Sequence, residues 1–127
     1  MRQGYPLVVD GQVMGFAKGV VAEGRFAFLS GVTGQGATMG DQAESVWATI
    51  KERAEALGGR LENIVQRMTF VTSVPEWRAE GQARQRAWLE KNCPSMIESP
   101  PAGTLIGCSA LAQPEFKVEI QVIVALD

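Results

Sequence analysis

Histidine is missing from this 127-residue chain, and its absence limits the chemistry that the protein can perform. Histidine is the commonest general base, and it completes Ser–His and Cys–His nucleophile pairs and most zinc sites. Cys93 and Cys108 follow no metal-ligand spacing, and without a histidine neither thiol has its usual activating base. Any catalysis therefore has to use Glu, Asp, Lys, Tyr, Cys, Arg or backbone groups, and we expect no metal.

Glu119 stands in the last predicted strand, where the two faces of the strand differ in polarity. One face is wholly β-branched and the other is half polar: Val118, Ile120, Val122 and Val124 alternate with Glu119, Gln121, Ile123 and Ala125. The β-branched face suits a layer of helices. A second face that is half apolar is usually buried against another chain. We therefore expect Glu119 in or beside a subunit interface.

A glycine-rich loop runs from Gly31 to Gly40 and leads into a helix. A phosphate-binding loop of this kind ends in Gly-Lys-Ser/Thr, which is absent here. Asp41 at the start of the helix would also repel a phosphate placed there. We expect a flexible loop near a ligand cleft instead.

Hydrophobic periodicity predicts the elements that position these residues. They are strands at 7–9, 16–22 and 25–30, a helix from Asp41 to Leu57, a strand at 64–73, a helix from Ser73 to Asn92, an extended proline-rich segment, and strands at 103–110 and 116–126. Asp10-Gly11 is a hairpin turn signal, and Asp41 with Glu44 has the pattern of a helix cap. This order predicts one α+β domain over residues 1–127, with a mixed sheet and two helices on one face.

Composition excludes several classes of partner. The 12 basic and 14 acidic residues give a formal net charge of -2 and form no basic run. Nucleic-acid binding requires clustered Lys and Arg, so we expect no nucleic-acid partner. No apolar stretch approaches the roughly 20 residues of a membrane helix, and the N-terminus has no signal-peptide pattern. We expect a cytoplasmic protein with free thiols and no membrane partner.

Short motifs spread over nearly the whole chain resemble those of a known family. They are Gly15-Phe16-Ala17-Lys18-Gly19, Phe28-Leu29-Ser30-Gly31, Leu57-Gly58-Gly59, Phe70-Val71-Thr72, Pro101-Ala102 and Val118-Glu119-Ile120. Their order resembles the Rid/YjgF reactive-intermediate deaminases. The resemblance implies a chorismate-mutase-like fold and a homotrimer with a small-molecule cleft at each subunit interface. It also implies hydrolysis of reactive enamines and imines without a cofactor, because an imine is already electrophilic.

The family's functional positions carry over residue by residue. Its water-activating Glu corresponds to Glu119, its pocket aromatic residue to Phe16, and the Ser-Gly pair beside its cleft to Ser30 and Gly31. The arginine that clamps the substrate carboxylate in the best-known members falls on Gly103.

Loss of that arginine matters because an arginine fork makes charge-assisted hydrogen bonds of roughly 1.5–3 kcal/mol each. Glycine offers a backbone N–H alone. The stretch from Gly103 to Gly107 is similar to an arginine-lacking branch of the family, some of whose members resemble 2-aminomuconate deaminases. We expect the N–H groups of Gly103 and Thr104 to hold the substrate's anionic end.

Arg67 and Lys18 are the cations best placed to replace the missing arginine. Arg67 alternates with Thr69 and Val71 in a strand that should be covered, where an unpaired charge is unusual. A structural ion pair, for example with Glu119, is the favoured interpretation, and binding of a ligand carboxylate is the alternative.

Three functions remain open at this stage. The leading hypothesis is a hydrolytic deaminase of enamine or imine metabolites that carry a carboxylate, with 2-aminomuconate as one candidate substrate and Glu119 as the proton shuttle. The second is a trimer that binds a small metabolite without chemistry. The third, an RNA-cleaving or translation-inhibiting protein, is disfavoured by the acidic balance and the lack of histidine.

Overall fold

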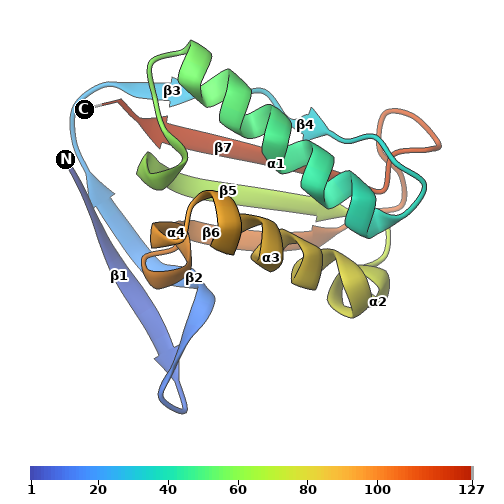
Figure 1. The fold of residues 1–127 in the computed structure, drawn as a ribbon, viewed down its shortest axis with the longest axis horizontal. Coiled ribbons are helices and arrows are strands. Elements are labelled where there is room, and N and C mark those ends of the chain that lie inside the picture. Colours follow the sequence, from blue (N-terminus) through green and yellow to red (C-terminus); the bar gives the residue numbers. More distant parts are fainter. Residues whose placement is uncertain (127) are drawn as a thin grey trace.

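The computed structural model describes residues 1–126, in which a five-stranded mixed sheet carries helices on one face and a β-hairpin at one side (Figure 1). The sheet has the order β3-β7-β5-β6, with β4 also paired to β7. Its strands are β3 (Phe26–Phe28), β4 (Val32–Thr33), β5 (Ile64–Val71), β6 (Ala102–Gly107) and β7 (Val118–Ala125). The β5–β6 pair is parallel and the other pairs are antiparallel. The predicted α+β class is confirmed.

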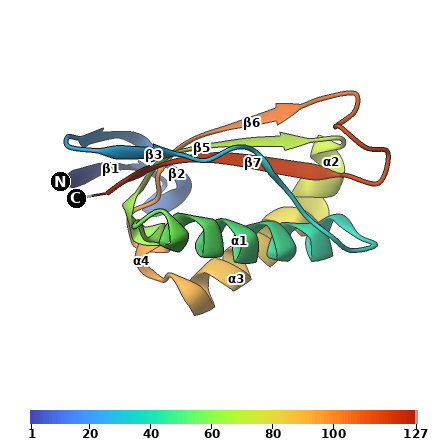
Figure 2. The same ribbon diagram turned by 90° about the horizontal axis from the view of Figure 1, so that it is seen from above.

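Helix α1 (Met39–Ala56) covers the sheet, and its apolar stripe forms the core with β7 (Figure 2). Trp47 and Ile50 are fully buried against the β-branched face of β7, as the alternation predicts. The predicted cap at Asp41 is wrong. Thr38 is the N-cap, and its hydroxyl accepts a hydrogen bond from the backbone N–H of Asp41 at 3.1 Å. The helix therefore begins two residues before Asp41.

A second helical segment connects the parallel strands β5 and β6. It consists of α2 (Val74–Glu76), the π-helical turn η2 (Trp77–Gly81) and α3 (Gln82–Asn92). Ser73, the predicted start of this helix, is its N-cap, because its hydroxyl accepts a hydrogen bond from the N–H of Glu76. The segment that was expected to be extended contains a short helix, α4 (Ser95–Glu98). The 3-10 turn η1 (Leu61–Asn63) precedes β5.

The outer edge of the sheet is interrupted where β3 gives way to β4. Leu29 still donates its backbone N–H to Val122 at 3.1 Å, but pairing lapses at Ser30 and Gly31 before β4 begins. The glycine-rich loop that follows is attached to the body by Gln42 of α1, which is 1% exposed. Its Nε2 donates to the carbonyl oxygens of Gly36 and Glu115, so the loop has a defined anchor.

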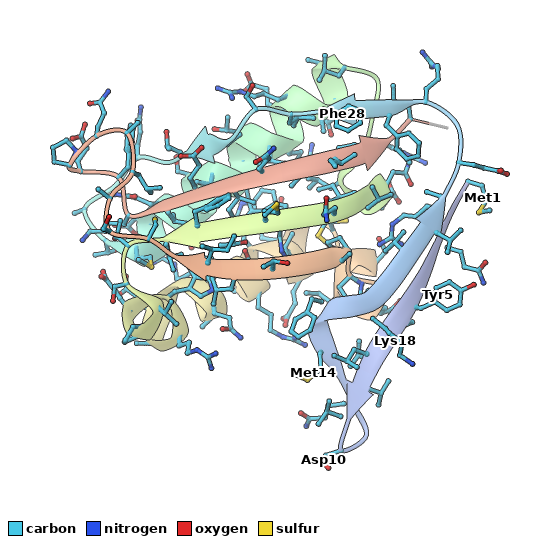
Figure 3. All side chains as sticks on the ribbon, turned by 180° about the vertical axis from the view of Figure 1, so that it is seen from behind. Met1, Tyr5, Asp10, Met14, Lys18 and Phe28 are labelled. Carbon is cyan, nitrogen blue, oxygen red and sulfur yellow. The ribbon has the colours of Figure 1, made fainter. Side chains whose placement is uncertain are left out.

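Strands β1 (Arg2–Val9) and β2 (Gln12–Ala22) form a hairpin that extends from the side of the domain (Figures 1 and 3). Its turn is the predicted Asp10-Gly11, with φ angles of 51° and 78°. Ala17 of β2 donates its backbone N–H to the carbonyl of Pro101 at 2.8 Å, just before β6. This bond holds the neighbouring Phe16 beside β6. Among residues 1–126, no helix has the length and apolarity to cross a bilayer.

Candidate functional site

Glu119 and Arg67 lie on opposite faces of the sheet. Cross-strand partners share a face, and the register pairs Glu119 with Phe70 but Arg67 with Val122. Val122 belongs to the buried face beneath the helices. Glu119 therefore faces the open side of the sheet, and the ion pair expected between Arg67 and Glu119 is not formed within the chain.

The Glu119 carboxylate lies directly over the backbone of Gly31. A Cβ added at Gly31 would collide with the carboxylate of Glu119, so the close approach requires glycine at this position. Thr33 is the cross-strand partner of Glu119 in β4, and the exposed Ser30 precedes Gly31. Among residues 1–126 the Glu119 carboxylate has no ion-pair or hydrogen-bond partner. The structure thus places Glu119, Ser30 and Gly31 next to one another.

A cavity of about 440 Å³ lies on the opposite side, between the sheet, the hairpin and the second helical segment. Four of the residues singled out from the sequence line it: Phe16, Arg67, Gly103 and Thr104. Its other walls include the apolar side chains of Trp77, Leu89, Met96 and Ile97 together with polar side chains of the second helical segment. No Asp or Glu is among the lining residues. The predicted site residues therefore form two separate groups in one chain.

Arg67 is the buried polar group of this cavity. It is 8% exposed, and its Nη2 donates to the carbonyl oxygen of Gly15 at 2.8 Å. No ion pair within residues 1–126 involves Arg67. Burial lowers the pKa of Arg67 to about 10, because the charged guanidinium loses water without gaining a carboxylate. The cavity thus contains a cation that the protein itself does not neutralise.

Gly103 stands directly beside Arg67, as its register partner in β6. A Cβ at Gly103 would lie 3.3 Å from Nη2 of Arg67 and 3.3 Å from Cβ of Phe16. The Arg67 guanidinium thus occupies the space into which a side chain at residue 103 would project. Lys18, the other candidate cation, is exposed on the hairpin and does not line the cavity (Figure 3).

The helical wall of the cavity carries polar residues that the sequence reasoning did not select. They are Arg78, Gln82, Gln85 and Arg86. Trp47 donates its indole N–H to Oε1 of Gln85 at 2.8 Å, which leaves the Gln85 NH₂ group as a donor. The spacing of these four residues forms a polar stripe on a helix expected to pack against a sheet, and that stripe is the signal that could have identified them.

The π-helical turn helps to shape this wall. Trp77 and Arg78 lie within it, and the Trp77 ring packs against Gly81, where a Cβ would collide with the ring. Single π-turns inside helices occur frequently at functional sites. Among residues 1–126 no cluster of acidic or cysteine side chains could hold a metal ion.

Comparisons with known proteins agree on one family. The model of the family described as endoribonuclease L-PSP matches residues 12–126. No curated protein matches the chain. A Rid-family protein of unknown function from Yersinia pestis is 24% identical, with 88% of this chain and 87% of that chain covered and a TM-score of 0.72.

Two further solved structures share the fold. A Pseudomonas aeruginosa protein of unknown function is 26% identical, with coverage of 100% and 94% and a TM-score of 0.67. A Mycobacterium tuberculosis member of the YjgF family is 19% identical, with 98% of each chain covered and a TM-score of 0.66. The chain therefore belongs to the endoribonuclease L-PSP family, which is the YjgF/Rid family.

Proposed function

We propose that this protein is a hydrolytic deaminase of enamine or imine metabolites that carry a carboxylate, of the 2-aminomuconate type. The observation that carries the proposal is the Glu119 carboxylate, which has no partner within residues 1–126 and lies over the bare backbone of Gly31. A carboxylate placed in this way can accept a proton from a water molecule held next to a substrate.

The chemistry needs one general base and no cofactor. An enamine first tautomerises to its imine. Water then adds to the imine carbon while Glu119 accepts a proton from it and passes that proton to the imine nitrogen, which forms a carbinolamine. Glu119 next takes the proton of the carbinolamine hydroxyl and gives it to the amino group, the C–N bond breaks, the C=O bond forms, and ammonia leaves. The cavity beside Phe16 and Gly103 receives the acid end of the substrate.

A homotrimer is part of the proposal, because Glu119 and the cavity face opposite sides of one chain. A second chain that packs on the open face would bring its own cavity towards Glu119. The open face is suited to such packing. It carries apolar side chains at Phe28, Met68, Phe70, Ile106 and Ile123, and Phe28 is 74% exposed (Figure 3).

The experiment measures ammonia release from 2-aminomuconate and from enzymatically generated 2-aminoacrylate. We expect wild-type turnover of at least one substrate and a loss of roughly 10²–10⁴-fold in kcat/KM for Glu119→Gln, the size typical of a lost general base. Gln121→Ala, on the same face of β7, is the matched control and should retain activity.

Two outcomes would replace this proposal by its rivals. Absence of ammonia release combined with thermal stabilisation by carboxylic acids would identify a metabolite-binding protein. Cleavage of RNA by wild type would support the activity in the family's description; an RNA ligand would reveal itself by strong dependence of binding on salt.

A further inference from the structure

The charged side chains around the cavity beside Arg67 indicate the class of ligand that the cavity binds. Three arginines line it, at residues 67, 78 and 86, and no acidic side chain does. Arg86 is paired with Glu90 at 2.9 Å on the helix surface. Arg67 and Arg78 have no ion-pair partner among residues 1–126. The cavity therefore presents two cations that its own chain leaves unneutralised.

Arg67 and Arg78 differ in how deeply their side chains are buried. Arg67 is 8% exposed and lies against Gly103 at the sheet, whereas Arg78 is exposed on the π-helical turn. The same cavity is also lined by the apolar side chains of Phe16, Trp77 and Leu89. A buried guanidinium without an acid is costly, and a ligand anion would remove that cost.

We propose that the cavity binds a dicarboxylate, with one carboxylate on Arg67, the second on Arg78, and a short apolar chain between them. The volume of about 440 Å³ falls within the usual range for small-molecule sites. One Arg67 nitrogen donates to Gly15, so the remaining nitrogens are available for a ligand carboxylate. The NH₂ group of Gln85 provides a further donor.

This inference rests on the proposed function in taking the ligand to be the substrate, and it names the substrate class. Arg67 here takes the role that an arginine at position 103 would have, from the neighbouring strand. An acid with a single carboxylate would engage Arg67 and leave Arg78 unused. The second carboxylate thus distinguishes the expected substrate from small substrates such as 2-aminoacrylate, which have a single carboxylate.

The test is calorimetric titration of the full-length protein with two matched, unreactive acids. Muconate (hexa-2,4-dienedioate) has two carboxylates, and sorbate (hexa-2,4-dienoate) has the same diene with one. We expect muconate to bind at least tenfold more tightly than sorbate. Arg78→Gln should reduce the affinity for muconate to that for sorbate and leave sorbate binding unchanged.

Arg67 is tested with two variants. Arg67→Met should weaken both acids by at least tenfold, and Arg67→Lys should recover part of the loss, because it restores the charge without the fork. Arg53→Gln removes an exposed arginine of α1 that does not line the cavity, and it should change neither affinity. Equal affinity for the two acids, or unchanged binding by Arg67→Met, would overturn the inference.

The binding result is independent of turnover. Tight muconate binding without ammonia release from any imine would support the dicarboxylate site and remove the deaminase. Turnover of 2-aminoacrylate that is unaffected by Arg67→Met would support the deaminase and remove the dicarboxylate site.

Discussion

Arg67 and Gly103 are register partners across the parallel strands β5 and β6, and Nη2 of Arg67 lies 3.3 Å from the point where a Cβ of residue 103 would stand. The two positions therefore share one volume, and a long side chain at either one excludes it at the other. A Cβ alone at 103 would displace Arg67 by a few tenths of an ångström, whereas a long side chain there would compete with Arg67 for the cavity.

Gly103→Arg should therefore destabilise the protein, because a second guanidinium would enter the space that Arg67 fills. We expect a loss of roughly 2–4 kcal/mol from overpacking and from uncompensated buried charge. The double variant Arg67→Met/Gly103→Arg should recover at least half of that loss. Urea denaturation of wild type, the two single variants and the double variant, all at one protomer concentration, measures the coupling free energy between the two positions. Additive losses would show that the two positions do not compete.

Arg67→Met should raise the free energy of unfolding at neutral pH. The pKa of Arg67 is lowered from 12.5 to about 10 in the folded chain, so the unfolded chain binds more protons between these values. At about 1.4 kcal/mol per pKa unit, the buried charge costs about 3 kcal/mol below pH 10. That cost falls as pH rises through 10, so wild type should regain stability relative to Arg67→Met.

The measurement is urea unfolding of wild type and Arg67→Met at pH 7 and near pH 11. The lost hydrogen bond should matter little, because Gly15 is exposed and water can reach its carbonyl. A lower free energy of unfolding for Arg67→Met than for wild type at pH 7 would mean that Arg67 stabilises the fold.

Gly31→Ala should disturb the Glu119 carboxylate, since the added Cβ would occupy its position. We expect a loss of ammonia release comparable to that of Glu119→Gln, together with a modest loss of stability. Glu119→Ala in the same chain should relieve the stability loss by removing the collision. Gly19→Ala is the control, because a Cβ there meets nothing within 4 Å. Full activity of Gly31→Ala would remove Glu119 from the mechanism.

Gln42→Leu should cost roughly 2–4 kcal/mol of folding free energy, because it removes three hydrogen bonds between a buried amide and part-buried backbone groups. The Gln42 amide donates to Gly36 and Glu115 and accepts from the N–H of Lys117 at 2.8 Å. Thermal denaturation, with the exposed Gln35→Leu as control, measures the effect. Proteolysis should also cut the glycine-rich loop faster in Gln42→Leu. Equal melting temperatures would show that water replaces the amide.

Phe28→Glu should prevent assembly through the open face, because it places a charge where an apolar contact is expected. We expect light scattering to show a homotrimer for wild type and smaller species for Phe28→Glu. Leu57→Glu, which alters another exposed apolar residue at the end of α1, is the matched control. A wild-type monomer, or a Phe28→Glu protein that assembles normally, would contradict the proposed interface.

Most of the fold could be predicted from periodicity. The β-branched face of β7 and the apolar stripe of α1 each identify the surface that is buried, and both are confirmed. The N-terminus of α1 was misplaced because Thr38 and Asp41 offer overlapping capping patterns. Side-chain type alone does not decide between them, since the preceding loop determines which residue reaches the first free N–H groups.

The site was predictable only in part. The structure places Glu119 beside Gly31, as the assigned positions imply, but the expected ion pair between Arg67 and Glu119 is not formed, because it depends on strand register. Alternation indicates which residues of β5 share a face, yet it does not say whether Arg67 pairs with Val122 or with its neighbour. The polar helical wall was missed for a related reason. The π-turn inserts an extra residue and rotates the residues after it, so a regular helical repeat does not give the face that each later residue occupies.

The interruption between β3 and β4 affects how copies of this protein can meet. A long, regular outer strand would offer unpaired N–H and C=O groups to any extended chain nearby and would seed fibrils. Here the outer strand is three residues long and breaks at Ser30 and Gly31, so it makes a poor template. The same break that places Gly31 under the Glu119 carboxylate therefore also makes this edge of the sheet poorly suited to strand pairing between copies.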